Sequence, residues 1–217
     1  MKTNESAGRP PKEYTADLAS VRGVIIEAAA LPIEVKPVPG GTLRVIFTET
    51  DENDIISAET QDGVWTLQHR KKRDGTLFSR VSCSGRVRVE LPEEFHGDLT
   101  VEGQNAPVSV DPLPVLANVE FGTINAPIRL DGVECGSLTA VTRNAPVKVD
   151  GIVSRNIALE TSNGAVSGTI KGDQRDYFIE SRTKNAKNDL PGTSDEGQPG
   201  RLSVITSNAP ISLRFVS

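Results

Sequence analysis

A short tripeptide recurs along the second half of the chain. Asn-Ala-Pro begins at Asn105, Asn125, Asn144 and Asn208, and Asn163-Gly164-Ala165 falls in the same phase. The successive spacings are 20, 19, 19 and 45 residues, and the last gap leaves room for a weaker copy around Asn185. Repeats of this length form supersecondary units that bury their apolar faces only by stacking on neighbours. The repeat therefore restricts the fold to a series of similar units.

The residues that flank each asparagine carry the same apolar pattern. Positions six and four before it, and three and five after it, are apolar in nineteen of twenty cases; the exception is Gly168. Such regularity is unexpected in a chain with 36% apolar residues. Only nine residues are aromatic, so the core must consist mainly of Val, Ile and Leu, which favour strands.

The spacing also predicts a corner at each asparagine. Residues two apart share one face of a strand, but the positions four before and three after would face opposite ways in one straight strand. The chain must bend to return both pairs to one core. We expect the asparagine to make this bend with left-handed backbone angles, and the proline to return the chain to an extended conformation.

These features predict an all-β fold, a right-handed single-stranded parallel β-helix (β-solenoid) with coils of about 19–23 residues. The alternative is an antiparallel β-sandwich or meander. We expect a disordered tail at 1–18 and one domain at 19–217. Within it, 19–95 form irregular coils or a cap, 96–217 form the regular repeats, and 184–200 form a mobile loop. Strands are expected at 24–38, 42–48, 64–69 and 86–91.

Composition limits the classes of partner. The net charge of −5 disfavours a generic nucleic-acid binder. The basic cluster Arg70-Lys71-Lys72-Arg73 precedes the turn signal Asp74-Gly75, so we expect a solvated hairpin tip, with an anionic-surface patch as the alternative. No apolar run is long enough for an export signal or a membrane span. The sequence as written predicts a cytoplasmic protein, and a trimmed sequence would allow the cell surface.

Three sets of residues are candidate sites. The column of Asn105, Asn125, Asn144, Asn163 and Asn208 is expected to be a structural corner ladder, with a binding strip as the alternative. Asp111, Asp131 and Asp150 each follow an asparagine by six residues, so they open turns or, stacked together, bind a cation such as Ca²⁺. Cys83 and Cys135 are either two buried thiols or a disulfide. No motif indicates a metal, a cofactor or a catalytic centre.

The corners Thr161-Ser162-Asn163-Gly164 and Thr206-Ser207-Asn208 resemble those of the bacterial putative-adhesin family, a domain of unknown function with β-solenoid repeats. The segment Val87-Arg88-Val89-Glu90-Leu91-Pro92, leading to Leu99-Thr100-Val101, is similar too, and the resemblance covers about 21–217. It implies a solenoid fold and a role at the cell envelope. This sequence departs from the family in having Ala-Pro at most corners in place of Gly.

Three functions follow, in order of preference. The first is a non-catalytic, envelope-associated scaffold or adhesin-like domain that binds a protein or glycan through a laddered β surface. The second is an intracellular assembly or regulatory partner whose ends stack between subunits. The third is a polysaccharide-active β-helix enzyme that uses acidic residues such as Asp131 and Asp150.

Overall fold

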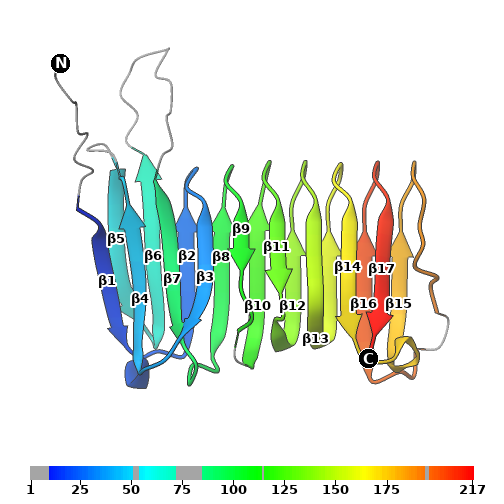
Figure 1. The fold of residues 1–217 in the computed structure, drawn as a ribbon, viewed down its shortest axis with the longest axis horizontal. Coiled ribbons are helices and arrows are strands. Elements are labelled where there is room, and N and C mark those ends of the chain that lie inside the picture. Colours follow the sequence, from blue (N-terminus) through cyan, green and yellow to red (C-terminus); the bar gives the residue numbers. More distant parts are fainter. Residues whose placement is uncertain (1–9, 51–53, 72–84, 114, 194–195) are drawn as a thin grey trace, which may run out of the picture.

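The computed structural model describes residues 10–50, 54–71, 85–113, 115–193 and 196–217. Over these residues the fold is almost entirely β (Figure 1). The N-terminal strands are β1 (Lys12–Asp17), β2 (Gly23–Ala28), β3 (Ile33–Val38), β4 (Thr42–Thr48), β5 (Asp54–Gln61), β6 (Val64–Lys71) and β7 (Arg86–Pro92). The others are β8 (Asp98–Gly103), β9 (Val108–Val110), β10 (Leu116–Thr123), β11 (Ile128–Asp131), β12 (Glu134–Val141), β13 (Val147–Glu160), β14 (Val166–Lys171), β15 (Tyr177–Arg182), β16 (Gly200–Ile205) and β17 (Ile211–Val216). Two short 3-10 helices, η1 (Leu18–Ser20) and η2 (Gln174–Asp176), complete the described elements.

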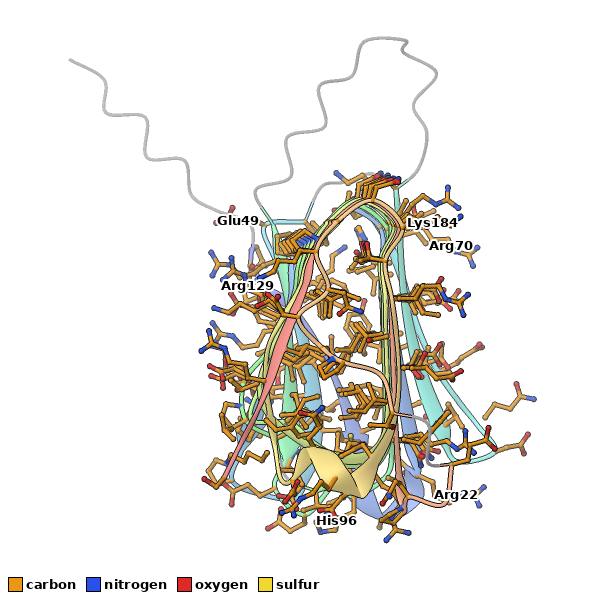
Figure 2. All side chains as sticks on the ribbon, turned by 90° about the vertical axis from the view of Figure 1, so that its right-hand side faces the viewer. Arg22, Glu49, Arg70, His96, Arg129 and Lys184 are labelled. Carbon is orange, nitrogen blue, oxygen red and sulfur yellow. The ribbon has the colours of Figure 1, made fainter. Side chains whose placement is uncertain are left out.

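The strands form two facing ladders. Ladder A contains, in spatial order, β1, β4, β7, β3, β9, β11, the first part of β13, β14 and β17. Ladder B contains β5, β6, β2, β8, β10, β12, the second part of β13, β16 and β15. Because β13 runs from one ladder into the other, all the strands join in one continuous sheet. Viewed along the stack, equivalent side chains superpose in rows (Figure 2).

Each repeat contributes one strand to each ladder, and the repeats pair in parallel. Leu99 lies beside Val119, which lies beside Leu138, and the same level continues through Ile157 to Leu202. The predicted all-β fold with parallel strands is confirmed. The antiparallel alternative is wrong for the repeats, since it would require reversed strand directions between consecutive coils.

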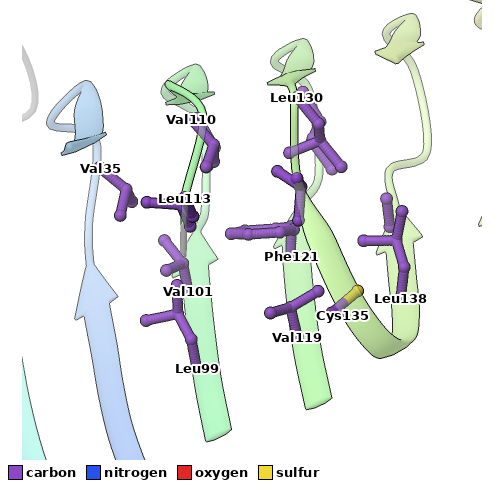
Figure 3. Close-up of a cluster of buried hydrophobic side chains, with 14 of the residues drawn as sticks. Val35, Leu99, Val101, Val110, Leu113, Val119, Phe121, Leu130, Cys135 and Leu138 are labelled. Atoms are coloured by element: carbon purple, nitrogen blue, oxygen red, sulfur yellow. The ribbon is translucent and has the colours of Figure 1, made fainter. Parts of the chain in front are cut away.

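The core lies between the two ladders (Figure 3). All nineteen apolar residues of the repeat pattern are buried there. The exception, Gly168, has a φ of 133°, and a Cβ at this position would lie 1.5 Å from the carbonyl oxygen of Val149. The pairing of β13 with β14 shifts register just after this point, so the glycine is required where two coils approach closely.

The N-terminal half contains coils and an antiparallel cap. The coil formed by β2 and β3 lies between the coil of β6 and β7 and that of β8 and β9. The segment 24–38, expected to be strand throughout, is divided by a corner at which Ala30 has a φ of 60°. β4 pairs antiparallel with β7, β1 pairs antiparallel with β4, and β5 pairs antiparallel with β6.

The expected disordered tail is wrong for its last part. Lys12–Asp17 forms β1, and Asp17 then caps η1 by accepting a hydrogen bond from the backbone N–H of Ala19 at 3.0 Å. Residues 1–9 lie outside the described part of the chain. β1 is amphipathic only through Tyr14 and Ala16, which pack on the core, so its apolar signal is weak.

The C-terminal strands are not in sequence order. β16 lies between β13 and β15, so the last coil is inserted beneath a strand that precedes it in the chain. The segment expected to be a mobile loop, 184–200, is held against this end over residues 188–193. Leu190 is buried, Asn188 forms an isolated parallel bridge with Ile211, and the backbone N–H of Ile179 donates to Thr193 Oγ1 at 2.7 Å.

No helix in the described ranges is long and apolar enough to cross a membrane.

Candidate functional site

The asparagines form one column along the top of the stack. From the second asparagine onward, each Nδ2 donates to the Oδ1 of the asparagine before it in the stack at 2.6–2.7 Å. In spatial order the column contains Asn105, Asn125, Asn144, Asn163, Asn208 and Asn185. Asn185, the weaker copy, therefore lies beyond Asn208, because β16 and β17 are inserted before it. We call these six residues the asparagine column.

The backbone of the corner differs from the expectation. Among the described residues, the non-glycine residues with positive φ are Ala30, Glu49 and Asp62, and no asparagine of the column is one of them. Left-handed angles at asparagine are therefore the wrong explanation of the bend. The backbone N–H of each corner asparagine from Asn144 onward donates to a carbonyl in the neighbouring coil, for example Asn144 to Ile124 at 3.0 Å. The side-chain amides add a second set of contacts between coils.

A buried threonine, whose role at the corner was not predicted from the sequence, lies two residues before most of these asparagines. Thr123, Thr142, Thr161 and Thr206 are at most 8% exposed. Their hydroxyls donate to corner carbonyls; Thr161 donates to Ala145 at 3.1 Å and Thr206 to Gly164 at 3.2 Å. The signal was present as Thr-x-Asn in five corners, including Thr183-Lys184-Asn185.

The outer face of ladder B carries a second polar row. Asn118 Nδ2 donates to Asp98 Oδ1 at 2.8 Å, and Ser137 Oγ donates to Asn118 Oδ1 at 2.7 Å. Asn156 and Arg201 occupy the next two places in this row. Nearer the corners, burial and the neighbouring carboxylates of Glu120 and Glu27 raise the pKa of Glu102.

Two depressions follow this row and share Ser137 and Asn156 in their walls. The larger, about 750 Å³, extends from Val115 to Tyr177, and Cys135 and Arg155 also line it. The smaller, about 210 Å³, lies over Ala158 and is bounded by Phe178 and Glu180. The Arg201 guanidinium stacks over the Phe178 ring, 5.4 Å from its centroid. We call the two depressions together the ladder B groove.

The two weakly acidic groups in the groove are protonated at neutral pH. Burial raises the pKa of the Cys135 thiol, and burial and then Asp176 raise the pKa of the Tyr177 hydroxyl. Tyr177 donates its hydroxyl proton to the backbone oxygen of Ser154 at 2.7 Å. Because the thiolate is the nucleophilic form of cysteine, this environment disfavours covalent catalysis by Cys135. The hydroxyl, amide and aromatic groups in its walls can form hydrogen bonds and stacking contacts with a ligand.

The three aspartates Asp111, Asp131 and Asp150 take part in turns, a hydrogen bond and an ion pair. Asp131 and Asp150 lie side by side, and each precedes a glycine with a left-handed φ, Gly132 at 55° and Gly151 at 61°. Asp150 accepts a hydrogen bond from Thr169 Oγ1. Asp111 lies 3.6 Å from Nζ of Lys36. No group of three or more His, Cys, Asp or Glu residues in the described chain is arranged to hold a metal ion.

The remaining candidates are partly outside the described residues. Cys83, Lys72, Arg73 and Asp74-Gly75 all lie in the undescribed stretch 72–84, while Cys135 is a free, buried thiol. Arg70 and Lys71 end β6. In the same strand His69 is buried, with Nε2 3.3 Å from Oδ1 of Asp54 on β5. Burial lowers the pKa of His69, although Asp54 opposes this shift.

The fold and this surface together define a class of protein: an all-β stack of parallel coils with polar columns on its outside. The model of the Toastrack DUF4097 family matches residues 22–171, which is more than half of the chain, and the chain belongs to that family. The resemblance to a putative-adhesin domain family of unknown function is thereby confirmed. No curated protein sequence matches the chain.

Two solved structures show the breadth of the likeness. A putative cell adhesion protein from Clostridium sporogenes superposes with a TM-score of 0.54 at 12% identity, covering 95% of this chain and 100% of the other. A putative adhesin from Parabacteroides merdae gives a TM-score of 0.33 at 11% identity, covering 95% and 96%. At 12% identity the first structure shows a similarity of fold and no more. Nothing further is concluded from the second structure, because its TM-score is low.

Proposed function

We propose that the chain is a non-catalytic, adhesin-like scaffold domain of the bacterial envelope that binds a protein or glycan through the outer face of ladder B. The observation that supports this role most directly is the ladder B groove. It crosses several coils, so an extended ligand could follow it along the stack.

The chemistry of the groove fits a polar ligand bound weakly at several points. Hydroxyl and amide groups of Ser137, Asn156 and Ser203 offer both donors and acceptors. Phe178 provides an aromatic surface, and the Arg201 guanidinium over it adds charge. The name of the similar Clostridium sporogenes structure, a putative cell adhesion protein, agrees with such a role. We also propose that the stack winds in a right-handed β-solenoid, which is the usual hand for parallel strands joined by crossovers.

The first test is the location of the native protein. Fractionation is expected to find the full-length protein with the cell envelope, and protease shaving of intact cells is expected to cleave it. Protection inside the cell would contradict the envelope role.

The second test is binding. Immobilised glycans and extracellular matrix proteins are screened against the purified chain, and any hit is measured again with Asn156→Ala and Phe178→Ala. Each variant is expected to weaken binding about threefold to thirtyfold, which corresponds to the loss of one hydrogen bond or one aromatic contact. Lys148→Ala on ladder A is the matched control and is expected to bind normally. Unchanged binding by both groove variants would place the site elsewhere.

A further inference from the structure

Each ladder ends in an edge strand, and the two ends of ladder A are similar in form. Among the described residues, β1 pairs only with β4 at the N-terminal end, and β17 pairs with β14 at the C-terminal end. Both strands have six residues. The two ends lie at opposite extremes of the long axis of the molecule (Figure 1). Edge strands of this kind offer backbone groups for pairing with another chain.

Part of the C-terminal edge is open. The segment that follows Asn185 covers Ile211 alone: the N–H of Ile211 donates to Lys187, and its carbonyl accepts from Asp189, both at 3.0 Å. From Leu213 onward, no strand in the described chain pairs with the outer side of β17. Ladder B differs at this end, because Thr193 exchanges hydrogen bonds with Ile179 on the outer side of β15. The open edge therefore belongs to ladder A.

Apolar surface remains exposed at the same two ends. The partly buried apolar residues that pack against the core are Tyr14, Ala16, Leu18, Ile56 and Phe215. The first four are at the N-terminal end, and Phe215 belongs to β17. The core side chains are therefore only partly buried at each end, whereas they are fully buried in the middle of the stack.

The strands at the two ends are aligned in direction and level. β1 is antiparallel to β4, which is antiparallel to β7, so β1 runs in the same direction as the parallel strands down to β17. Those pairings also place Tyr14 level with Leu213, so a parallel pairing of β1 with β17 in this register would set Ala16 beside Phe215. A copy placed beyond β17 would therefore continue ladder A with core-facing residues beside core-facing residues.

The charges of the two ends are opposite. The exposed charged residues of β1 and β5 are three acidic and one basic, whereas those of β15, β17 and 183–190 are four basic and two acidic. Arg214 would lie level with Thr15 of a following copy. On the same outward face it would stand between Asp17 and Glu13, and Glu13 also pairs with Arg44 of its own chain at 3.0 Å. Opposite charges on adjacent strands stabilise their pairing. This complementarity favours a second copy of the chain over an unrelated strand.

We propose that copies of this chain assemble head to tail, with β1 of one copy pairing in parallel with residues 213–216 of the next. Two different surfaces meet in this contact, so a pair of copies keeps one free surface of each kind. The assembly is therefore open and grows with concentration rather than closing as a symmetric dimer. The inference is independent of ligand binding by the ladder B groove.

The test is sedimentation velocity over a concentration series of the full chain. The weight-average mass of the wild type is expected to rise past that of a dimer, and to rise less at high salt because the contact is partly electrostatic. A monomer at every concentration, or a mass that stops at the dimer, would overturn the proposal.

Charge variants locate the contact. Arg214→Glu alone and Glu13→Lys alone are each expected to weaken association about fivefold to tenfold, because each replaces an attraction with a repulsion. The double variant in one chain restores the opposite signs and is expected to recover association. Arg129→Glu, on the same ladder but in the middle of the stack, is the control, and a thermal melt of each variant confirms that the fold is intact. If neither single variant weakens association relative to the wild type, this contact is ruled out.

Discussion

At each corner the asparagine recurs because of its side chain. Its backbone does not use left-handed angles, but its amide both donates and accepts along the stack. The recurrence could be read from the sequence, as could the alternatives of a ladder or a binding strip. The corner geometry could not, because it depends on carbonyls of the neighbouring coil that become partners only after stacking.

We expect Asn144→Ala to lower the free energy of unfolding by about 1–2 kcal/mol, because it removes two amide hydrogen bonds of the asparagine column. Urea unfolding followed by circular dichroism measures this loss. The control is Arg143→Ala, which changes the adjacent exposed side chain and leaves the column intact. If both variants unfold at the same urea concentration, the column is not a structural element.

The buried pair of His69 and Asp54 predicts a dependence of stability on pH. Burial lowers the pKa of His69 in the folded state below its ordinary value of 6.5. Between these two pKa values the unfolded chain binds more protons than the folded chain, so stability is complete above pH 6.5 and falls as the pH drops through the folded pKa. His69→Gln should reduce this slope in urea unfolding measured at several pH values. His96→Gln, which changes an exposed histidine, should keep it.

At the scale of the elements, apolar periodicity predicted strands better than it predicted their ends. The repeats and 42–48, 64–69 and 86–91 coincide closely with observed strands, because each has alternating apolar residues facing a core. β5 was missed since all but one of its residues are exposed or half-buried and it gains its conformation from pairing with β6. The groove could not be predicted, because its walls come from β12, β13, β15 and β16, whose spatial order departs from their sequence order.

We expect Gly168→Ala to destabilise the fold by about 2 kcal/mol more than Gly172→Ala. Both glycines have positive φ, 133° and 117°, but a Cβ at 168 would collide with the backbone of Val149, whereas one at 172 would meet no atom within 4 Å. The difference therefore isolates the close approach between β13 and β14. Thermal unfolding of the two variants measures it, and equal losses would show that the backbone angle alone accounts for the glycine.

At the scale of the whole molecule, stability should vary along the stack. Central coils have partners on both sides. Within the part of the chain that the structure describes, β1, β5 and β17 each lack a strand partner on all or part of one side. In a stack of this kind each coil is stabilised mainly by its nearest neighbours. The sequence predicted the repeating units but not their order, because the insertion of β16 and β17 leaves no trace in the spacing beyond a long gap.

Hydrogen exchange at low protein concentration is expected to show this gradient. Backbone amides of β10 to β12 should exchange only through global unfolding, and those of β1, β5 and β17 through local opening at the ends. Asn144→Ala should accelerate exchange in the central coils. Uniform protection from end to end would indicate that the stack unfolds as a single unit.

The inserted last coil also has a consequence for biosynthesis. During translation β15 leaves the ribosome before β16 and β17, so the place between β13 and β15 stays vacant until the final strands have been made. A nascent chain halted at residue 199 would lack an internal layer, not an outer one, and would expose the edge of β13 on one side and that of β15 on the other. Such an incomplete chain would present two unpaired strand edges to quality-control proteases. A chain that contains β16 and β17 would not present these two edges.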